Sequence, residues 1–272
     1  MIPNTLSIAG VDPSGGAGIL ADIKAMSALG AYGTAVVAAL TAQNTQGVTA
    51  ISAVPHEFVT AQIDTLFADV RIDAVKIGML GQKLVTRAVA ERMEHWKPAH
   101  LVLDPVMVAK SGDHLLERAA VNELRDSLLP QATMLTPNLP EAGVLLGSSP
   151  VDSVREMRRV AEKLRRLLDD RGERWVFLKG GHLPGNDTID VLHDGDRMIE
   201  LPGTRIITPN THGTGCTLSA ALAALLPQVN DVPEAARRAK AYLVAAIARS
   251  GELSVGSGHG PVQHFHAWWP AP

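Results

Sequence analysis

The sequence predicts an α/β protein with a central, mostly parallel sheet and helices on both faces. Two observations predict this class. Short apolar runs alternate with longer segments of helical spacing, and polar or glycine-bearing residues follow the apolar runs. Continuous apolar runs are typical of strands that helices cover on both sides. The 272 residues hold no internal repeat, low-complexity stretch or linker, so we expect a single domain, residues 1–272.

The first predicted unit is a strand at residues 6–9, a glycine loop at 10–18 and a helix at 19–29. The loop lacks the Gly-Lys-Ser/Thr of a Walker A motif and does not fit the G-x-G-x-x-G dinucleotide fingerprint. It is either a tight turn or a place where the backbone approaches a ligand closely. Asp22 falls in the first turn of the helix, so we expect its carboxylate near the loop mouth. There it either serves a ligand or compensates the helix dipole.

A second apolar run at residues 34–40 leads into a polar strand end at 41–45. Gln43 and Asn44 place two amides there, and an amide can recognise the edge of a heterocycle because it carries both a donor and an acceptor. Taken alone, the same residues are typical of a loop.

From residue 58 the chain alternates between helices and buried strands, as in a parallel sheet. We expect helices at 58–67 and 83–96, and strands at 74–77 and 101–103. Ligands of such sheets bind beyond the carboxyl ends of the strands. We therefore expect one crevice, formed by the segments that follow the strands: Gly78-Met79-Leu80, Asp104-Pro105-Val106-Met107, Thr136-Pro137-Asn138-Leu139-Pro140-Glu141 and Lys179-Gly180-Gly181-His182.

Three further elements receive no predicted role in the chemistry. A helix at 154–168 is amphipathic, with interleaved charges on a solvated face. A turn at Asp194-Gly195-Asp196 predicts a hairpin or an antiparallel edge over residues 188–201, and a last helix covers 233–250.

Two other features admit a functional and a structural interpretation. Residues 109–113 are a polar segment with a glycine, which is either a mobile flap or an ordinary loop. His264 and His266 lie two residues apart near the C-terminus, where we favour surface or packing positions over half of a metal site. No third ligand has a suitable spacing.

The predicted chemistry depends on residues 210–226, where a glycine-punctuated turn runs directly into a segment rich in Ala and Leu. We expect a loop and then a helix at 217–225. The N–H groups of a first helical turn lack intrahelical partners and point, with the helix dipole, at whatever lies in front of them. Gly213 and Gly215 allow close approach, and Thr214 adds a hydroxyl donor. The segment therefore predicts an anion site suited to phosphate.

Cys216 is the only cysteine of the chain and stands at the end of this loop. A helix dipole favours the thiolate, so the position predicts a thiol pKa below about 8.5 and a group that can accept a proton. The alternative interpretation is a small residue that packs the start of the helix, because free cysteines are among the most buried residues.

Composition excludes several classes of function. The formal net charge is −3 with 19% charged residues, which leaves no positive excess for nucleic acid. No apolar run approaches the roughly 20 residues that cross a bilayer, so we expect no membrane contact. A single cysteine, and a start without basic and apolar signal regions, predict a cytoplasmic protein.

Six segments, taken in chain order, resemble the hydroxymethylpyrimidine/phosphomethylpyrimidine kinases of thiamine biosynthesis. They are GVDPSGGAGILADIKAMSALGAYGTAVVAALTAQNT, DAVKIGML, VLDPVMVAKSGD, LTPNLPEA, LKGGH and NTHGTGCTLSAALAAL. The likeness runs from Leu6 to the GPVQHFHAWW tail. It implies a ribokinase-like three-layer sandwich that uses ATP and Mg²⁺ and forms a homodimer. It also implies two successive phosphorylations, of 4-amino-5-hydroxymethyl-2-methylpyrimidine and then of its monophosphate.

The resemblance also implies roles for individual residues. The catalytic phosphate-transfer loop corresponds to Gly213, Thr214, Gly215 and Cys216. The pyrimidine contacts correspond to Gly10, Asp22, Gln43, Met79 and Val106. The nucleotide contacts correspond to Asn138, Lys179 and Thr211. The metal positions correspond to Glu141 and Asp104.

Cys216 departs from the wider superfamily, where most members have Asp as the catalytic base, although the pyrimidine kinases share the cysteine. The change is tolerable because phosphoryl transfer depends mainly on alignment and on neutralising charge. In the second step the acceptor is already a phosphate oxygen, which needs no deprotonation. We therefore hypothesise that Cys216 assists the first step more than the second.

Three alternatives are weighed against this interpretation. A pyridoxal kinase of the same superfamily would act on a hydroxymethyl group of a similar flat heterocycle, and Gln43 favours the pyrimidine modestly. A cysteine hydrolase would pair Cys216 with His212, but no third, orienting group is identifiable. A non-catalytic vitamer-binding protein would have no need of the Asn138 and Glu141 pair.

Overall fold

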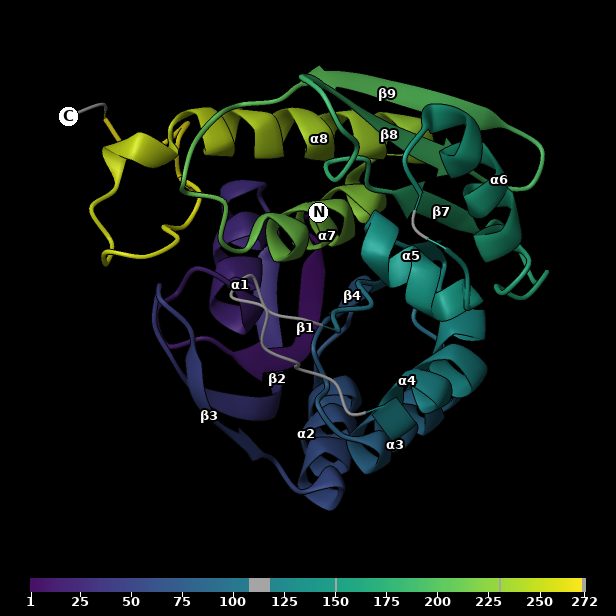
Figure 1. Ribbon diagram of the computed structural model, residues 1–272. Helices are drawn as coiled ribbons and strands as arrows, with labels where there is room; N and C mark the ends of the chain where they lie inside the picture. Colours follow the sequence, from purple (N-terminus) through teal and green to yellow (C-terminus); the bar gives the residue numbers. More distant parts are fainter. Residues whose placement is uncertain (108–117, 150, 230, 271–272) are drawn as a thin grey trace.

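The structure is a computed structural model that describes residues 1–107, 118–149, 151–229 and 231–270. Within these ranges nine strands form one sheet in the order β3-β2-β1-β4-β5-β6-β7-β8-β9 (Figure 1). The predicted flap at residues 109–113 lies outside the described ranges.

The sheet has a parallel centre and antiparallel edges, so the predicted mostly parallel sheet is confirmed. The parallel strands are β1 (Asn4–Val11), β2 (Tyr32–Gln43), β4 (Ala74–Ile77), β5 (His100–Leu103), β6 (Met134–Leu135) and β7 (Trp175–Leu178). The antiparallel strands are β3 (Val48–Ala53), β8 (Asp187–His193) and β9 (Met198–Thr204). The predicted hairpin at residues 188–201 is confirmed as β8 and β9.

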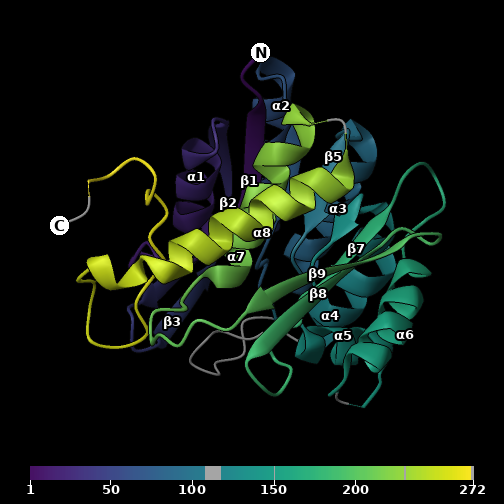
Figure 2. The ribbon, with the colours of Figure 1, turned by 90° about the horizontal axis from the view of Figure 1, so that it is seen from above.

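Helices cover both faces of the sheet, which gives the three expected layers. One face carries α1 (Gly18–Ala28), α7 (Thr214–Leu225) and α8 (Val232–Ala248), with α8 lying across α7 in Figure 2. The other face carries α2 (His56–Asp69), α3 (Lys83–Trp96), α4 (Arg118–Glu123), α5 (Leu139–Leu146) and α6 (Val154–Arg165).

Two element boundaries near the site are decided by the tertiary structure. β2 ends at Gln43, within the predicted polar strand end at 41–45, because β3 pairs with it antiparallel as far as Gln43 and Val48. β3 itself was not predicted. Helix α7 begins at Thr214 rather than at residue 217, because Gly213 has a φ of 75° and ends the loop as the N-cap.

Alternation along the strands separates two cores. Val75 and Ile77 of β4 join the core under α2 and α3, whereas Ala74 joins the core under α1 and α7. Successive side chains of a strand point to opposite faces, so Lys76 points toward α1 and α7. A fully buried lysine thus stands where the second core would otherwise be apolar.

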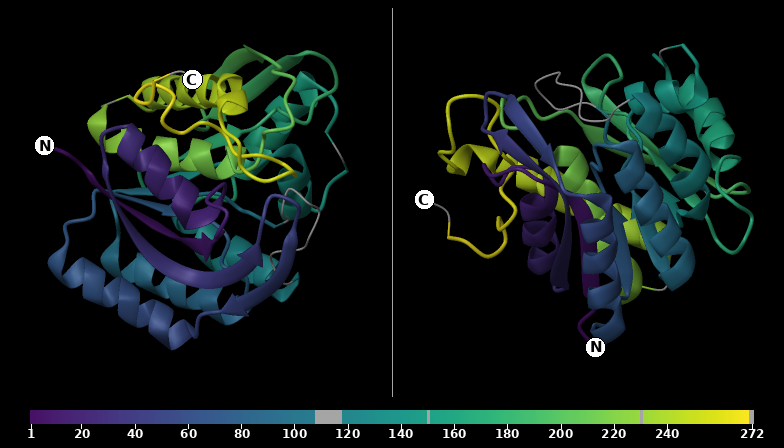
Figure 3. Two further views of the ribbon diagram at one scale, coloured as in Figure 1. Left: turned by 90° about the vertical axis from the view of Figure 1, so that its left-hand side faces the viewer. Right: turned by 90° about the horizontal axis from the view of Figure 1, so that it is seen from below.

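The C-terminal tail packs on the face of α1, α7 and α8 (Figure 3). Trp268 Nε1 donates to the Ala28 carbonyl at 3.1 Å. His264 is buried, with its Nε2 3.1 Å from Thr217 Oγ1, and burial lowers the pKa of His264 to about 3. The predicted packing role is confirmed for His264. Within the described chain, no helix has both the length and the apolar character to span a membrane.

Candidate active site

A cavity of about 460 Å³ opens at the carboxyl ends of the parallel strands. The predicted convergence of the strand ends on one crevice is confirmed. Every predicted site residue except Asp22 lines this cavity: Gly10, Gln43, Met79, Asp104, Val106, Asn138, Glu141, Lys179, Thr211, Gly213, Thr214, Gly215 and Cys216. Their individual roles remain predictions.

The two glycine loops lie against each other at the cavity. A Cβ atom on Gly213 would stand 1.7 Å from the carbonyl oxygen of Gly16, and the φ of 75° at Gly213 also favours glycine. The close approach places residues 10–18 and 211–216 around the start of α7. The first turn of α7, with the positive end of its dipole, therefore faces the cavity, where the sequence predicts an anion site.

Asp12 and His212 tie these loops together, and sequence reasoning assigned Asp12 no role. Asp12 Oδ2 lies 2.6 Å from His212 Nε2 and accepts a hydrogen bond from the Ala17 N–H at 3.0 Å. Both side chains are buried. Among the described residues, no hydrogen bond joins His212 to Cys216, so the structure gives no support to a hydrolase in which His212 activates Cys216.

Cys216 lines the cavity, but the predicted fall of its pKa is wrong. Burial raises the pKa of the Cys216 thiol to about 11, and the nearby Asp22 and Asp104 add to the rise. Lys76 and the Gly18 N–H oppose this shift without cancelling it. Desolvation and the negative neighbours thus shift the thiol pKa upward, opposite to the effect expected of a helix dipole.

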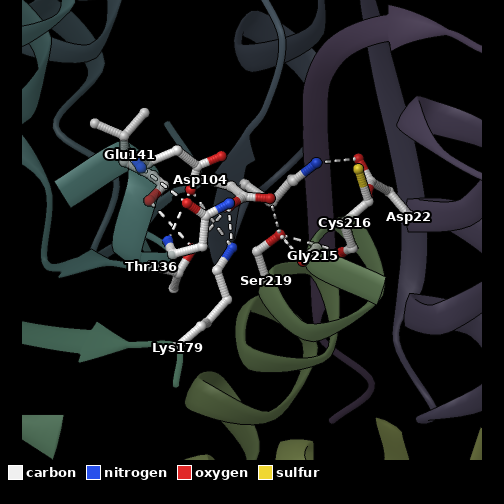
Figure 4. Close-up of polar contacts among 11 residues, drawn as sticks. Asp22, Asp104, Thr136, Glu141, Lys179, Gly215, Cys216 and Ser219 are labelled. Carbon is white, nitrogen blue, oxygen red and sulfur yellow. Dashed lines mark hydrogen bonds and ion pairs between the residues drawn. The ribbon is translucent and has the colours of Figure 1, made fainter. Parts of the chain in front are cut away.

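A lysine and two carboxylates form a cluster beside the start of α7 (Figure 4). Lys179 Nζ donates to Asp104 Oδ1 at 2.9 Å and lies 3.9 Å from Glu141 Oε2. Asp104 also accepts hydrogen bonds from Thr136 Oγ1 and from Ser219 Oγ of α7, each at 3.2 Å. Burial lowers the pKa of Lys179, but the two carboxylates outweigh it and the net shift is upward. The ammonium group of Lys179 lies next to Gly215, since a Cβ at Gly215 would stand 3.3 Å from Lys179 Nζ.

Asn138 and Glu141 form a capping box at the start of α5. Asn138 Oδ1 accepts from the Glu141 N–H and Glu141 Oε2 accepts from the Asn138 N–H, both at 2.8 Å. The N-x-x-E spacing that the resemblance assigns to phosphate and metal is thus also the spacing of a helix cap. The cap fixes Glu141 next to Lys179 in the cavity.

Glu141 is expected to reduce the stability of the protein at neutral pH. Burial raises the pKa of Glu141 from 4.5 to about 7, against the opposing charge of Lys179. As pH rises from about 4.5 to about 7, the unfolded chain releases a proton that the folded chain retains, so the free energy of unfolding falls. Glu141→Gln keeps the cap and removes this cost. At pH 8 it is expected to raise the free energy of unfolding by up to about 3 kcal/mol.

Urea denaturation at several pH values measures this effect. Glu156→Gln is the matched control, because Glu156 stands at the same position of α6 but is exposed. A Glu141→Gln variant whose stability advantage does not shrink below about pH 5 would contradict the assignment.

Asp22 does not line the cavity and is fully buried instead of lying at the loop mouth. Asp22 Oδ2 accepts hydrogen bonds from Ser7 Oγ at 2.6 Å and from Lys76 Nζ at 2.8 Å. Burial by itself lowers the pKa of Lys76. The net shift is upward, because the negative charges of three neighbours outweigh burial: Asp22, Cys216 and Asp104. Asp22 lies on the Cys216 side of the site, away from Lys179 (Figure 4). Sequence reasoning missed Lys76, although a lysine inside the apolar strand AVKI is a signal for it.

The two predicted metal positions offer carboxylate oxygens, which Mg²⁺ prefers. Asp104 and Glu141 both face Lys179, and no group of three or more His, Cys, Asp or Glu side chains able to hold a metal occurs among the described residues. Mg²⁺ is commonly held by one or two carboxylates together with substrate phosphates and water. The residues present therefore fit Mg²⁺ that enters with a nucleotide.

The fold and the site together define a kinase of the ribokinase-like class, with a mostly parallel sheet and a cavity in which a helix N-terminus lies beside a lysine–carboxylate cluster. The chain belongs to the phosphomethylpyrimidine kinase family, whose sequence profile matches residues 12–263. It is 51% identical to the hydroxymethylpyrimidine/phosphomethylpyrimidine kinase of Escherichia coli K12, over 98% of each chain. It is 50% identical to the enzyme of the same name from Rhizobium meliloti 1021, over 97% of each chain.

Solved structures are similar over most of the chain. The pyridoxal kinase of Bacillus subtilis in its ADP complex has a TM-score of 0.89 and 33% identity, covering 98% of this chain and 99% of that one. The phosphomethylpyrimidine kinase of Clostridium difficile 630 has a TM-score of 0.79 and 38% identity, covering 90% and 99%. These likenesses confirm the predicted fold class.

Proposed function

We propose that the chain uses ATP to phosphorylate the hydroxymethyl oxygen of 4-amino-5-hydroxymethyl-2-methylpyrimidine, and then to phosphorylate the monophosphate, in thiamine biosynthesis. The relatives that are 50 to 51% identical to the chain support this activity. The observation that carries it is the shared cavity, which holds both the anion site at the start of α7 and the amide of Gln43.

The phosphate end of the site acts mainly by positioning and by neutralising charge. The first-turn N–H groups at Gly213 to Cys216 receive the transferred group, and Lys179 adds a positive charge beside it. Asn138 and Thr211 contact the nucleotide. When bound, Mg²⁺ at Asp104 and Glu141 supplies further neutralisation of the phosphates. A loose transition state needs little more than this alignment.

The heterocycle end of the site recognises a flat ring. Met79 and Val106 supply apolar walls, and Gly10 lies directly against Met79, because a Cβ at Gly10 would stand 2.7 Å from Met79 Cε. Gln43 hydrogen-bonds the edge of the ring. Asp22 is buried outside the cavity, where its hydrogen bond with Lys76 holds the ammonium group near Cys216.

Cys216→Ala is expected to slow the first phosphorylation by about 10- to 100-fold and the second by less than about threefold. The alcohol of the first acceptor must release a proton, whereas the phosphate of the second need not.

Since the pKa of Cys216 is about 11, the first-step rate should rise with pH over the alkaline range in the wild type. That rise should be lost in the variant. Rapid-quench kinetics of the two separate steps, with Cys216→Ser as control, measure both effects. Equal losses in the two steps would contradict this role.

Mass spectrometry of the products tests the function directly. The purified protein is incubated with Mg²⁺-ATP and the hydroxymethylpyrimidine, and with pyridoxal in a parallel tube. We expect a monophosphate that proceeds to a diphosphate. If neither compound is phosphorylated, the catalytic interpretation of Gly213 to Cys216 fails, and a vitamer-binding protein becomes the better assignment.

A pyridoxal kinase is the second candidate. The specific observation in its favour is the TM-score of 0.89 to the Bacillus subtilis pyridoxal kinase. Phosphorylation of pyridoxal but not of the pyrimidine would establish a pyridoxal kinase. It would contradict the inference that Gln43 favours the pyrimidine, and would leave the roles proposed for the phosphate end of the site unchanged.

We also propose that the chain is a cytoplasmic homodimer. Exposed apolar side chains on β2 and β3, namely Tyr32, Leu40 and Ile51, support a subunit contact at that edge of the sheet. Light scattering after size-exclusion chromatography measures the mass, and a monomer at micromolar concentration would contradict the dimer.

A further inference from the structure

We infer that Thr41 sets which end of the Gln43 amide faces the ring, and thereby makes the site select a heterocycle with an exocyclic amino group over one with an oxo group. This inference rests on the proposed function, because it assumes that Gln43 meets the edge of the substrate. It adds Thr41 as a positioning residue for specificity.

Thr41 and Gln43 are close neighbours on β2. They are two residues apart in the strand, so their side chains point to the same face, and both line the cavity. Thr41 Oγ1 lies 2.9 Å from the carbonyl oxygen of Val11, at the end of β1. The same hydroxyl oxygen lies 3.0 Å from the side-chain amide of Gln43, at the position of Oε1.

The hydroxyl of Thr41 has one hydrogen, and two groups lie within hydrogen-bond distance of it. The Val11 carbonyl can only accept, so the contact at 2.9 Å is favourable only if Thr41 donates its hydrogen to Val11. Otherwise two oxygen atoms would face each other at this distance without a hydrogen between them. Once its hydrogen is used, Thr41 can only accept from Gln43.

The group that Gln43 turns toward Thr41 must then be its NH₂. The two ends of an amide have nearly the same shape, so the hydrogen-bond network decides which end lies on which side. With Nε2 donating to Thr41, both contacts of the hydroxyl are satisfied. The carbonyl Oε1 of Gln43 is left facing the cavity.

A carbonyl oxygen at this place in the cavity recognises a donor. An exocyclic amino group on the ring can donate to Gln43 Oε1, whereas an oxo group there would set two acceptors against each other. A mismatched buried pair of this kind weakens binding by about tenfold or more. The pair of Thr41 and Gln43 therefore favours amino over oxo heterocycles.

The test compares 4-amino-5-hydroxymethyl-2-methylpyrimidine with its 4-oxo analogue. In Thr41→Val the shape is nearly kept but the hydroxyl is lost, so the amide can turn around. We expect the amino-to-oxo ratio of kcat/KM to fall by about tenfold, mainly because the oxo analogue improves. Thr41→Ser keeps the hydroxyl and should keep the ratio. An unchanged ratio in Thr41→Val, or an equal fall in Thr41→Ser, would overturn the inference.

A second background separates orientation from general damage. In Gln43→Glu both side-chain oxygens only accept hydrogen bonds. Turning the carboxylate around therefore presents the same kind of acceptor to the ring. Thr41→Val should therefore alter the ratio much less in Gln43→Glu than in the wild type. Equal effects in the two backgrounds would show that Thr41 acts by packing alone, and would overturn the inference.

Calorimetric binding of the two heterocycles without ATP keeps this test separate from the proposed function. Binding that shows the expected ratios without phosphorylation would contradict the kinase assignment and support the role of Thr41. Phosphorylation of the amino compound, with an amino-to-oxo ratio that does not depend on Thr41, would support the kinase assignment and contradict the role of Thr41.

Discussion

Lys179→Met is expected to lower kcat for both phosphorylations by about 100- to 1,000-fold. The ammonium group of Lys179 is the fixed positive charge beside the start of α7, held by Asp104 and near Glu141. Because both steps transfer the same phosphoryl group, both should suffer equally. The variant also leaves two buried carboxylates without their cation, so KM for Mg²⁺-ATP is expected to change as well.

Steady-state and single-turnover kinetics with each acceptor measure this loss. Lys163→Met on the exposed face of α6 is the control for removal of a positive charge, and it should leave kcat unchanged. A Lys179→Met enzyme with unchanged kcat and only a raised KM for ATP would show that Lys179 binds the ground state. That outcome would contradict its role in the transfer itself.

Lys76→Met is expected to reduce the free energy of unfolding by about 3–5 kcal/mol, because it leaves the Asp22 carboxylate buried without its partner. Lys76 and Asp22 both have no exposed surface, and their Nζ to Oδ2 distance is 2.8 Å. The pair lies within electrostatic reach of Cys216, so the variant is also expected to raise the thiol pKa further.

The double variant Lys76→Met with Asp22→Asn distinguishes a lost ion pair from a packing defect. Neutralising both partners removes the uncompensated charge, so most of the stability should return. Equilibrium urea denaturation of the wild type, both single variants and the double variant gives the coupling energy. A loss of less than about 1 kcal/mol in the free energy of unfolding of Lys76→Met would contradict this account. So would a double variant whose loss equals the sum of the losses in the two single variants.

Local patterns predict much of the fold. The boundaries of β4 and α3 agree with the apolar periodicity, since these elements follow local sequence signals closely. β3 was missed because its residues are largely exposed and carry no apolar alternation; only its pairing with β2 makes it a strand. That pairing is also what carries β2 as far as Gln43.

The sequence by itself determines the alternation of helices and parallel strands, the glycine loops and the polar residues at the strand ends. From these follow the class of fold and, apart from Asp22, the predicted residues that meet in the cavity. The reason is physical: hydrophobic periodicity and helix-capping signals are local properties of the chain. Parallel strands then bring their carboxyl ends to one edge of the sheet.

Only the tertiary structure decides the charge states and the partners within the site. The helix dipole at Cys216 is a local effect, but the burial and the carboxylates that raise its pKa come from distant parts of the chain. Asp22 is turned away from the cavity because Lys76, 54 residues further on, is buried beside it. Such effects depend on desolvation and on distances between charges, which exist only once the layers have packed.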